Sequence, residues 1–148
     1  MLPNCIFRKA VVDDAQTIKQ MVYGEWLNPI GLDWRNFWVI EREQTVIACV
    51  QLRPWGNFKE LSSLVVLSDY RKNGIGTYLA KSAIEQANTS VYLSCGSNLK
   101  SFYRRCSFKQ VSRSKIPIAI AFEFGLSWII AASRRKQLIF MAYIQPQN

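Results

Sequence analysis

Residues 71–76 have the composition of a phosphate-binding loop, because two glycines and two cations stand between a strand-like run and a helix-like run. Successive main-chain N–H groups and the positive end of the helix can then converge on a diphosphate. Glycine at positions 74 and 76 lets the main chain approach such a ligand closely. A dinucleotide-binding fingerprint would need a third glycine where Leu79 stands, and GxxxxGK is absent, so both of those nucleotide folds are disfavoured. The alternative is a helix that begins at glycine and binds no ligand.

The apolar pattern around this loop predicts alternating strands and helices. Asp13 or Asp14 is expected to cap a first helix, a second helix covers 74–87, and Ser97 or Asn98 caps a short third one. Strands are expected, the second and third as a hairpin, at residues 6–12, 37–42, 45–53, 58–67, 90–95 and 138–144. This order predicts a mixed α/β sheet with helices on its faces, in a chain whose 148 residues suit one domain.

Two segments of the chain carry a family resemblance. The run from Leu64 to Gly76 resembles the strand and the [Q/R]-x-x-G-x-[G/A] loop of the GNAT acetyltransferases. Downstream, Ser97-Asn98, Phe102-Tyr103 and Cys106-Ser107-Phe108 resemble the second cofactor motif of that family, in which Gly-Phe usually closes a helix that carries a tyrosine. Cys106-Ser107 departs from the common Leu-Gly, residues 6–57 agree only in element order, and residues 112–148 match poorly.

The resemblance implies a mixed, splayed central sheet of about seven strands flanked by helices, in one GNAT-like domain over residues 1–148. The strand at Val65 and Val66 and the strand ending at Cys95 would diverge, so that the pantetheine of acetyl-coenzyme A lies between them. Main-chain amides of the loop would hold the pyrophosphate, Val66 would pair with pantetheine, and Asn98 would contact the cofactor arm. The implied cofactor-binding residues are Val65, Val66, Arg71, Lys72, Asn73, Gly74, Ile75, Gly76 and Asn98.

The implied reaction is direct transfer of an acetyl group to a primary amine of an acceptor, a small molecule or a protein, that the sequence does not name. Only the neutral amine attacks a thioester, and because the chain has no histidine the candidate bases are carboxylates. Glu60 lies where many family members place one, and a solvated position beside Lys59 is the alternative. Tyr103 lies where the family has its general acid, and a half-buried core tyrosine is the alternative. Ser94 stands where some relatives carry a glutamate.

The cysteine spacing bears on metal binding, and the compositions of the N-terminus and of the C-terminal part bear on location and membrane contact. The four cysteines show no CxxC spacing, and with no histidine present we expect no metal. The N-terminus lacks a signal-peptide pattern, so a cytoplasmic location is predicted. Residues 116–133 are almost wholly apolar but contain Pro117, Glu123 and Gly125. We favour a core element there, with a membrane-spanning helix or an interfacial contact as alternatives.

The formal net charge of +9 predicts attraction to anions, and coenzyme A phosphates or general solubility could each account for it. A basic nucleic-acid-binding module is therefore an alternative function. It lacks a known motif, and along the sequence Lys and Arg cluster only at 134–136, so specific nucleic-acid binding is not expected. A second alternative is an acyl-coenzyme A sensor that has lost catalysis, and a homodimer is left open.

Overall fold

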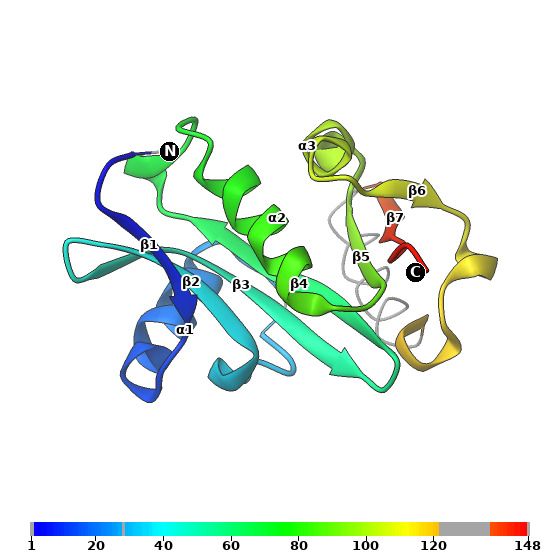
Figure 1. Cartoon of the computed structure of the whole chain (residues 1–148), viewed down its shortest axis with the longest axis horizontal. Coiled ribbons are helices and arrows are strands. Elements are labelled where there is room, and N and C mark those ends of the chain that lie inside the picture. The colour runs from blue at the N-terminus through cyan, green and yellow to red at the C-terminus, as the bar shows by residue number, and fades with distance from the viewer. Residues whose placement is uncertain (1, 28, 122–136, 148) are drawn as a thin grey trace.

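The computed structural model describes residues 2–27, 29–121 and 137–147 (Figure 1). Its strands form one mixed seven-stranded sheet in the order β1-β2-β3-β4-β5-β7-β6, which confirms the expected fold class. β4 and β5 are parallel, and the other neighbouring strands are antiparallel. The strands are β1 (Cys5–Lys9), β2 (Phe37–Arg42), β3 (Thr45–Trp55), β4 (Phe58–Val66), β5 (Val91–Gly96), β6 (Lys109–Val111) and β7 (Leu138–Tyr143).

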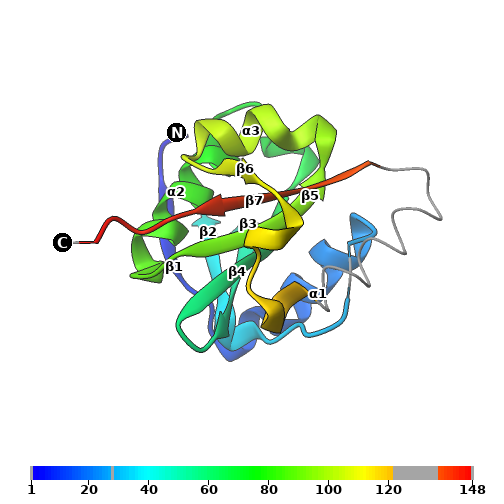
Figure 2. The same cartoon turned by 90° about the vertical axis from the view of Figure 1, so that its right-hand side faces the viewer.

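Helices cover both faces of the sheet (Figures 1 and 2). Val50 of β3 belongs to the same buried cluster as Leu79 of α2, whereas its neighbour Cys49 belongs to a cluster with Ile18 of α1. Because successive side chains of a strand point to opposite faces, α2 and α1 lie on opposite sides of β3. The helices are α1 (Ala15–Gly24), α2 (Ile75–Ala87) and α3 (Lys100–Arg105), with 3-10 turns η1 (Val12–Asp14), η2 (Trp34–Asn36), η3 (Ser68–Tyr70), η4 (Ser97–Leu99) and η5 (Arg113–Lys115).

The hairpin of β2 and β3 confirms the predicted pairing of residues 37–42 with the strand that follows. Arg42 pairs with Thr45, so Glu43 and Gln44 alone form the turn. Their φ angles of 50° and 64° are both left-handed, as the two central residues of a type I′ turn require. Neither residue is Gly or Asn, so the paired strands rather than the turn residues must stabilise this connection.

A bulge interrupts β4 just before the segment that resembles the GNAT strand. Ser62 pairs with Gln51 and Val65 pairs with Cys49, so two residues of β4 face one residue of β3. Ser63 has a φ of 52°, the left-handed value that an extra residue in a strand often adopts. The bulge shifts the side-chain alternation, which places Leu61 and Val65 in clusters on opposite faces of the sheet.

The sheet splays between β4 and β5, as expected. These strands pair only at Lys59 with Val91 and at Glu60 with Tyr92. Beyond that point β4 continues to Val66 and β5 to Gly96 without pairing to each other. The unpaired main chains of the two strands therefore face a common opening, and its β4 side forms one wall of the site described below.

Several predicted boundaries and caps are wrong. The first strand ends at Lys9, since η1 begins at Val12. Asp14 does precede α1, but its carboxylate accepts from the Val11 N–H at 2.8 Å instead of capping that helix. The third helix is preceded by η4 and has Leu99 at its N-cap, so neither Ser97 nor Asn98 caps it. The three-residue strand β6 was not predicted, because so short a run has no readable alternation.

Most of the apolar segment predicted at 116–133 lies outside the described residues, which stop at 121 before resuming at 137. In its described part Ile116 and Ile120 are buried against Phe58 and Tyr92, which agrees with a core element there. The predicted closing strand is present as β7. Within the described ranges, no helix is both long and apolar enough to cross a membrane.

Candidate active site

A pocket of about 570 Å³ lies between the unpaired half of β4, the start of α2 and helix α3. This volume is within the range of small-molecule sites in proteins. Its lining brings together most of the predicted cofactor residues and the predicted acid, namely Val65, Val66, Arg71, Lys72, Gly74, Ile75, Gly76 and Tyr103. Asn73, Asn98 and Glu60 are not part of this lining.

Gly74 begins α2 in a conformation that favours glycine. It is the N-cap residue with a φ of 77°, and a Cβ built there would meet no atom within 4 Å. Lys72 is also left-handed, with a φ of 63°. Left-handed residues just before a helix turn successive N–H groups toward one concave side, where an anion can accept them. The loop thus has the geometry expected of a diphosphate cradle.

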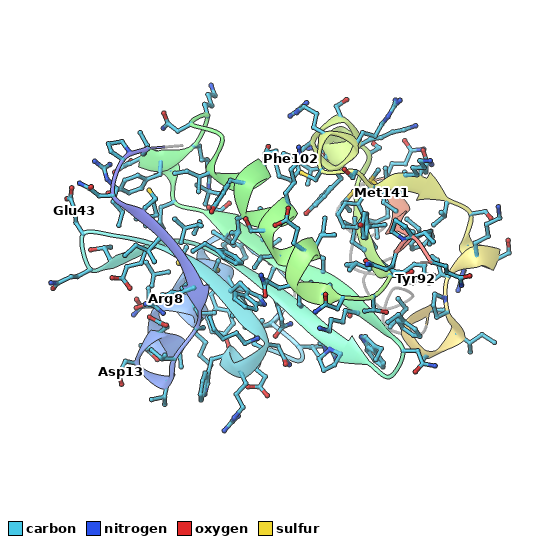
Figure 3. The ribbon with its side chains drawn as sticks, viewed as in Figure 1. Arg8, Asp13, Glu43, Tyr92, Phe102 and Met141 are labelled. Atoms are coloured by element: carbon cyan, nitrogen blue, oxygen red, sulfur yellow. The ribbon has the colours of Figure 1, made fainter. Side chains whose placement is uncertain are left out.

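Gly76 lies where the loop and α3 approach each other. A Cβ at this position would stand 3.4 Å from Phe102 and 3.5 Å from Val66, which is ordinary van der Waals contact. Figure 3 shows Phe102 on the side of α3 that faces α2. A methyl group therefore fits at residue 76, whereas a longer side chain must extend into the pocket.

Asn73 shapes the loop through its side chain. Its Nδ2 donates to the carbonyl oxygens of Tyr70 at 3.3 Å and Arg71 at 3.1 Å. These bonds close the loop on itself and hold the left-handed backbone in place. Asn73 therefore supports the cradle from outside the pocket lining.

Arg71 joins the loop to β4 and to the end of α1. Its Nε donates to the Val66 carbonyl oxygen at 2.9 Å, and its Nη2 pairs with the Glu25 carboxylate. The Val66 carbonyl therefore faces the opening between β4 and β5 rather than β3. This is the main-chain group that the resemblance assigns to pantetheine, so a bound pantetheine and the Arg71 side chain would share one acceptor.

Tyr103 lies at the boundary between the pocket and the core. It is only 7% exposed, and its ring makes edge contacts with Phe102 and Phe108. Burial raises the pKa of its hydroxyl, and the neighbouring Cys95 and Cys106 raise this pKa further. The phenol therefore stays protonated at neutral pH and can donate a proton. Tyr103 packs in the core and also lines the pocket, and its role as general acid stays a prediction.

A family model described as an acetyltransferase (GNAT) domain matches residues 33–110, more than half of the chain. The chain belongs to the GNAT acetyltransferase family. This is the family that the two cofactor motifs predicted. The match includes the bulged strand, the loop and helix α3, which supply most of the pocket lining.

Solved structures share this fold at low sequence identity. N-acetylglutamate synthase from Neisseria gonorrhoeae, complexed with coenzyme A and N-acetyl-glutamate, has a TM-score of 0.78 and 14% identity, over 99% of this chain and 36% of that one. Rv2747 from Mycobacterium tuberculosis, in complex with CoA and NLQ, has a TM-score of 0.76 and 17% identity, over 95% of this chain and 99% of that one. The ribosomal-protein-S18-alanine N-acetyltransferase from Escherichia coli has a TM-score of 0.69 and 12% identity, over 97% of this chain and 96% of that one. No curated protein sequence matches the chain.

The GNAT pocket fits coenzyme A in its chemistry. The open left-handed Gly74 leaves room for a phosphate beside the N-terminus of α2, and Lys72 adds a positive charge to the same wall. The Val66 carbonyl is an acceptor for a pantetheine amide. The residues that would hold the co-substrate are therefore the loop and the unpaired edge of β4.

Glu60 is buried in this GNAT fold, so the alternative of a solvated position beside Lys59 is wrong. It is 7% exposed and sits at the last pair that joins β4 to β5. Trp55 Nε1 donates to its Oε2 at 3.1 Å, and Arg53 Nη1 lies 3.6 Å from the same oxygen. The carboxylate is thus held in place where the two strands begin to separate, but it does not line the pocket.

The second GNAT motif ends β5 and closes α3. Asn98 is exposed and its side chain folds back, since a Cβ on Gly96 would stand 2.5 Å from its Oδ1. Ser107 takes the place of the usual glycine with a φ of 72°, so α3 ends as in the family although a serine bears the strain. Among the described residues, no group of three His, Cys, Asp or Glu side chains could hold a metal ion.

Sequence reasoning missed part of the pocket wall. Glu25, Leu27, Tyr70, Phe102 and other side chains line it together with the predicted residues. Glu25 lies 46 positions from its partner Arg71, and no local pattern connects two residues so far apart. Phe102 was named beside Tyr103 in the second motif, and that position was the available signal, because α3 turns its ring toward Gly76 of the loop.

Proposed function

We propose that this protein moves the acetyl group of acetyl-coenzyme A directly to a primary amine of an acceptor. The observation that carries the proposal is that Tyr103 lies in the same pocket as the phosphate loop and the Val66 carbonyl. A thioester that follows β4 away from the loop would then reach the phenol. The amine nitrogen would form a bond to the acyl carbon as the thioester C–S bond breaks, and Tyr103 would give its proton to the departing thiolate.

The cysteines support direct transfer rather than a covalent acyl-enzyme. Burial raises the pKa of the Cys95 thiol to about 11 and that of the Cys49 thiol to about 12, and it also raises the pKa of Cys106. The thiolate is the nucleophilic form, so these groups are inert at neutral pH. Attack by the acceptor amine itself needs no such intermediate.

Removal of a proton from the acceptor requires a base. An amine with a pKa of ~10.4 is neutral in only about one molecule in 2,500 at pH 7. We assign this task to Glu60, which would act through an intervening water because it does not line the pocket. Its partners Trp55 and Arg53 keep the carboxylate fixed at the point where the strands diverge.

The Glu60→Gln protein tests this assignment through its pH profile. With the base removed, turnover depends on the acceptor that is already neutral, whose share rises about tenfold per pH unit below its pKa. The deficit relative to wild type should therefore be largest at pH 7 and shrink toward pH 9. Trp55→Phe removes a hydrogen bond from the same carboxylate and is the control for a merely structural effect. A deficit that stays constant with pH would exclude Glu60 as the base.

The acceptor class is the finer part of the proposal. Similar structures are named for two kinds of amine, that of an amino acid in N-acetylglutamate synthase and that of an alanine of ribosomal protein S18. A screen with labelled acetyl-coenzyme A should therefore contain free amino acids, peptides with N-terminal alanine and simple polyamines. Transfer of label to any amine supports an enzyme. Tight co-substrate binding with no labelled product from any acceptor would favour the sensor instead.

Acetyl-coenzyme A is expected to stabilise the fold. A ligand at 100 times its dissociation constant adds about 2.7 kcal/mol to the free energy of unfolding. For a chain of this length that corresponds to a rise in Tm of roughly 5–10 °C. Differential scanning fluorimetry and calorimetry measure the two quantities independently. An unchanged Tm together with no heat of binding would contradict the co-substrate site.

A further inference from the structure

One end of the molecule carries a group of cations of which only Arg105 lines the active-site pocket. The chain from residue 86 to 121 contains no Asp or Glu, and its cations therefore supply most of the formal net charge of +9. Its cations come from α3, β6 and η5, which follow one another on the right-hand side of the molecule in Figure 1, the side that faces the viewer in Figure 2. We call these residues the basic strip: Lys100, Arg104, Arg105, Lys109, Arg113 and Lys115.

The arginines of the basic strip differ from the other described arginines in their partners. The five earlier arginines, from Arg8 to Arg71, each pair with a carboxylate. Within the described part of the chain, no ion pair joins Arg104, Arg105 or Arg113 to a carboxylate. All three are exposed, as are Lys109 and Lys115. The charge of the strip is therefore available to an external anion.

Neutral hydrogen-bonding groups lie between these cations. The exposed neutral side chains of the same segment include Ser101, Ser107, Gln110, Ser112 and Ser114. Among the described strands, β6 is the last of the sheet and pairs only with β7, so within the described residues one edge of its main chain has no strand partner. Cations, hydroxyls and main-chain N–H groups are the donors that contact phosphates in protein–nucleic acid complexes.

The shape and composition of the strip decide between anionic partners. Its charge extends over three successive elements, which suits a repeating anion rather than a single phosphate. The aromatic residues between Lys100 and Lys115 are partly or fully buried, namely Phe102, Tyr103 and Phe108, so this described part of the chain has no exposed platform on which unpaired bases could stack. We propose that the basic strip binds the sugar–phosphate backbone of a nucleic-acid duplex independently of its sequence, an activity beyond the proposed acetyl transfer.

Matched lysine variants test the proposal. The strip variant carries Lys109→Gln and Lys115→Gln, and the control carries Lys9→Gln and Lys19→Gln, which remove the same charge from exposed positions of β1 and α1. Fluorescence anisotropy with labelled RNA and DNA duplexes of equal length, from 50 to 200 mM salt, gives the affinity and its salt slope. Phosphatidylserine vesicles and polyglutamate serve as the other polyanions. The Tm and acetyl-coenzyme A affinity of both variants show whether fold and pocket are intact.

The strip variant is expected to bind duplex at least ~10-fold more weakly than the control, with a salt slope smaller by about 0.9 for each lost phosphate contact. Binding of the RNA duplex alone or of both duplexes supports the proposal and identifies the source of the backbone. Equal losses in both variants would show a diffuse charge effect and overturn it. Binding of vesicles or polyglutamate as tight as that of duplex, or no wild-type binding at 50 mM salt, would overturn it as well.

Discussion

The Gly76→Glu protein is expected to lose acetyl-coenzyme A binding while it keeps its fold. A Cβ at residue 76 makes only ordinary contact with Phe102 and Val66, and the rest of a glutamate side chain would extend into the pocket beside the loop. A carboxylate about 4 Å from a phosphate charge costs about 4 kcal/mol at the effective dielectric constant of a protein surface. The affinity should therefore fall close to a thousandfold, measured by isothermal titration calorimetry.

Two variants of the same residue separate charge from bulk. Gly76→Ala adds only a methyl group in ordinary contact distance and should bind nearly as wild type does. Gly76→Gln has the length of glutamate without its charge, so it should lose less affinity than Gly76→Glu. Gly74→Glu should also abolish binding, but at a φ of 77° any side chain strains the backbone, which makes it the weaker test. Unchanged affinity in a folded Gly76→Glu protein would refute the phosphate-loop assignment.

The Tyr103→Phe protein is expected to turn over ~10²-fold or more slowly, the scale of general acid catalysis. The substitution keeps the ring that packs against Phe102 and Phe108 and removes only the proton donor. Stability should change by less than about 1 kcal/mol, and the affinity for acetyl-coenzyme A should change little. Steady-state kinetics with an acceptor from the screen, or slow thioester hydrolysis, would supply the rate.

Tyr143→Phe is the control, because it removes a phenol that packs against Phe108 but does not line the pocket. The pH dependence gives a second readout. Since burial raises the pKa of Tyr103, this acid stays protonated as the pH rises through 9 and should cause no loss of rate in that range. Full activity in a stable Tyr103→Phe protein would return the residue to the core and leave the acid unassigned.

Local patterns were sufficient to predict the part of the site that is continuous in sequence. The loop from Arg71 to Gly76 and the helix after it are local structures, because glycine conformations and the N-terminal end of a helix depend on neighbouring residues. The order of strands and helices also followed from apolar periodicity, and with the motifs it predicted the splayed sheet that the structure has.

Features that depend on distant contacts could not be predicted. Ser63 in a left-handed bulge is one serine of a Ser-Ser pair with no turn signal, and its conformation follows from the register between β3 and β4. The buried position of Glu60 depends on Trp55 and Arg53 across the hairpin. The basic strip escaped notice because its cations are spread over 16 positions and come together only when α3, β6 and η5 fold to one end.

The two residue pairs that join β4 to β5 also bear on the cooperativity of unfolding. On one side of it lie the four antiparallel strands β1–β4, and on the other lie β5, β7 and β6. Main-chain bonds across this seam are few, so the two halves of the sheet can open as separate units with different local free energies. A molecule that lies along the seam as an added strand would connect those units. Occupancy of the pocket would then make the unfolding of the whole sheet more nearly a single event. The local free energy of opening would rise most in the less stable half.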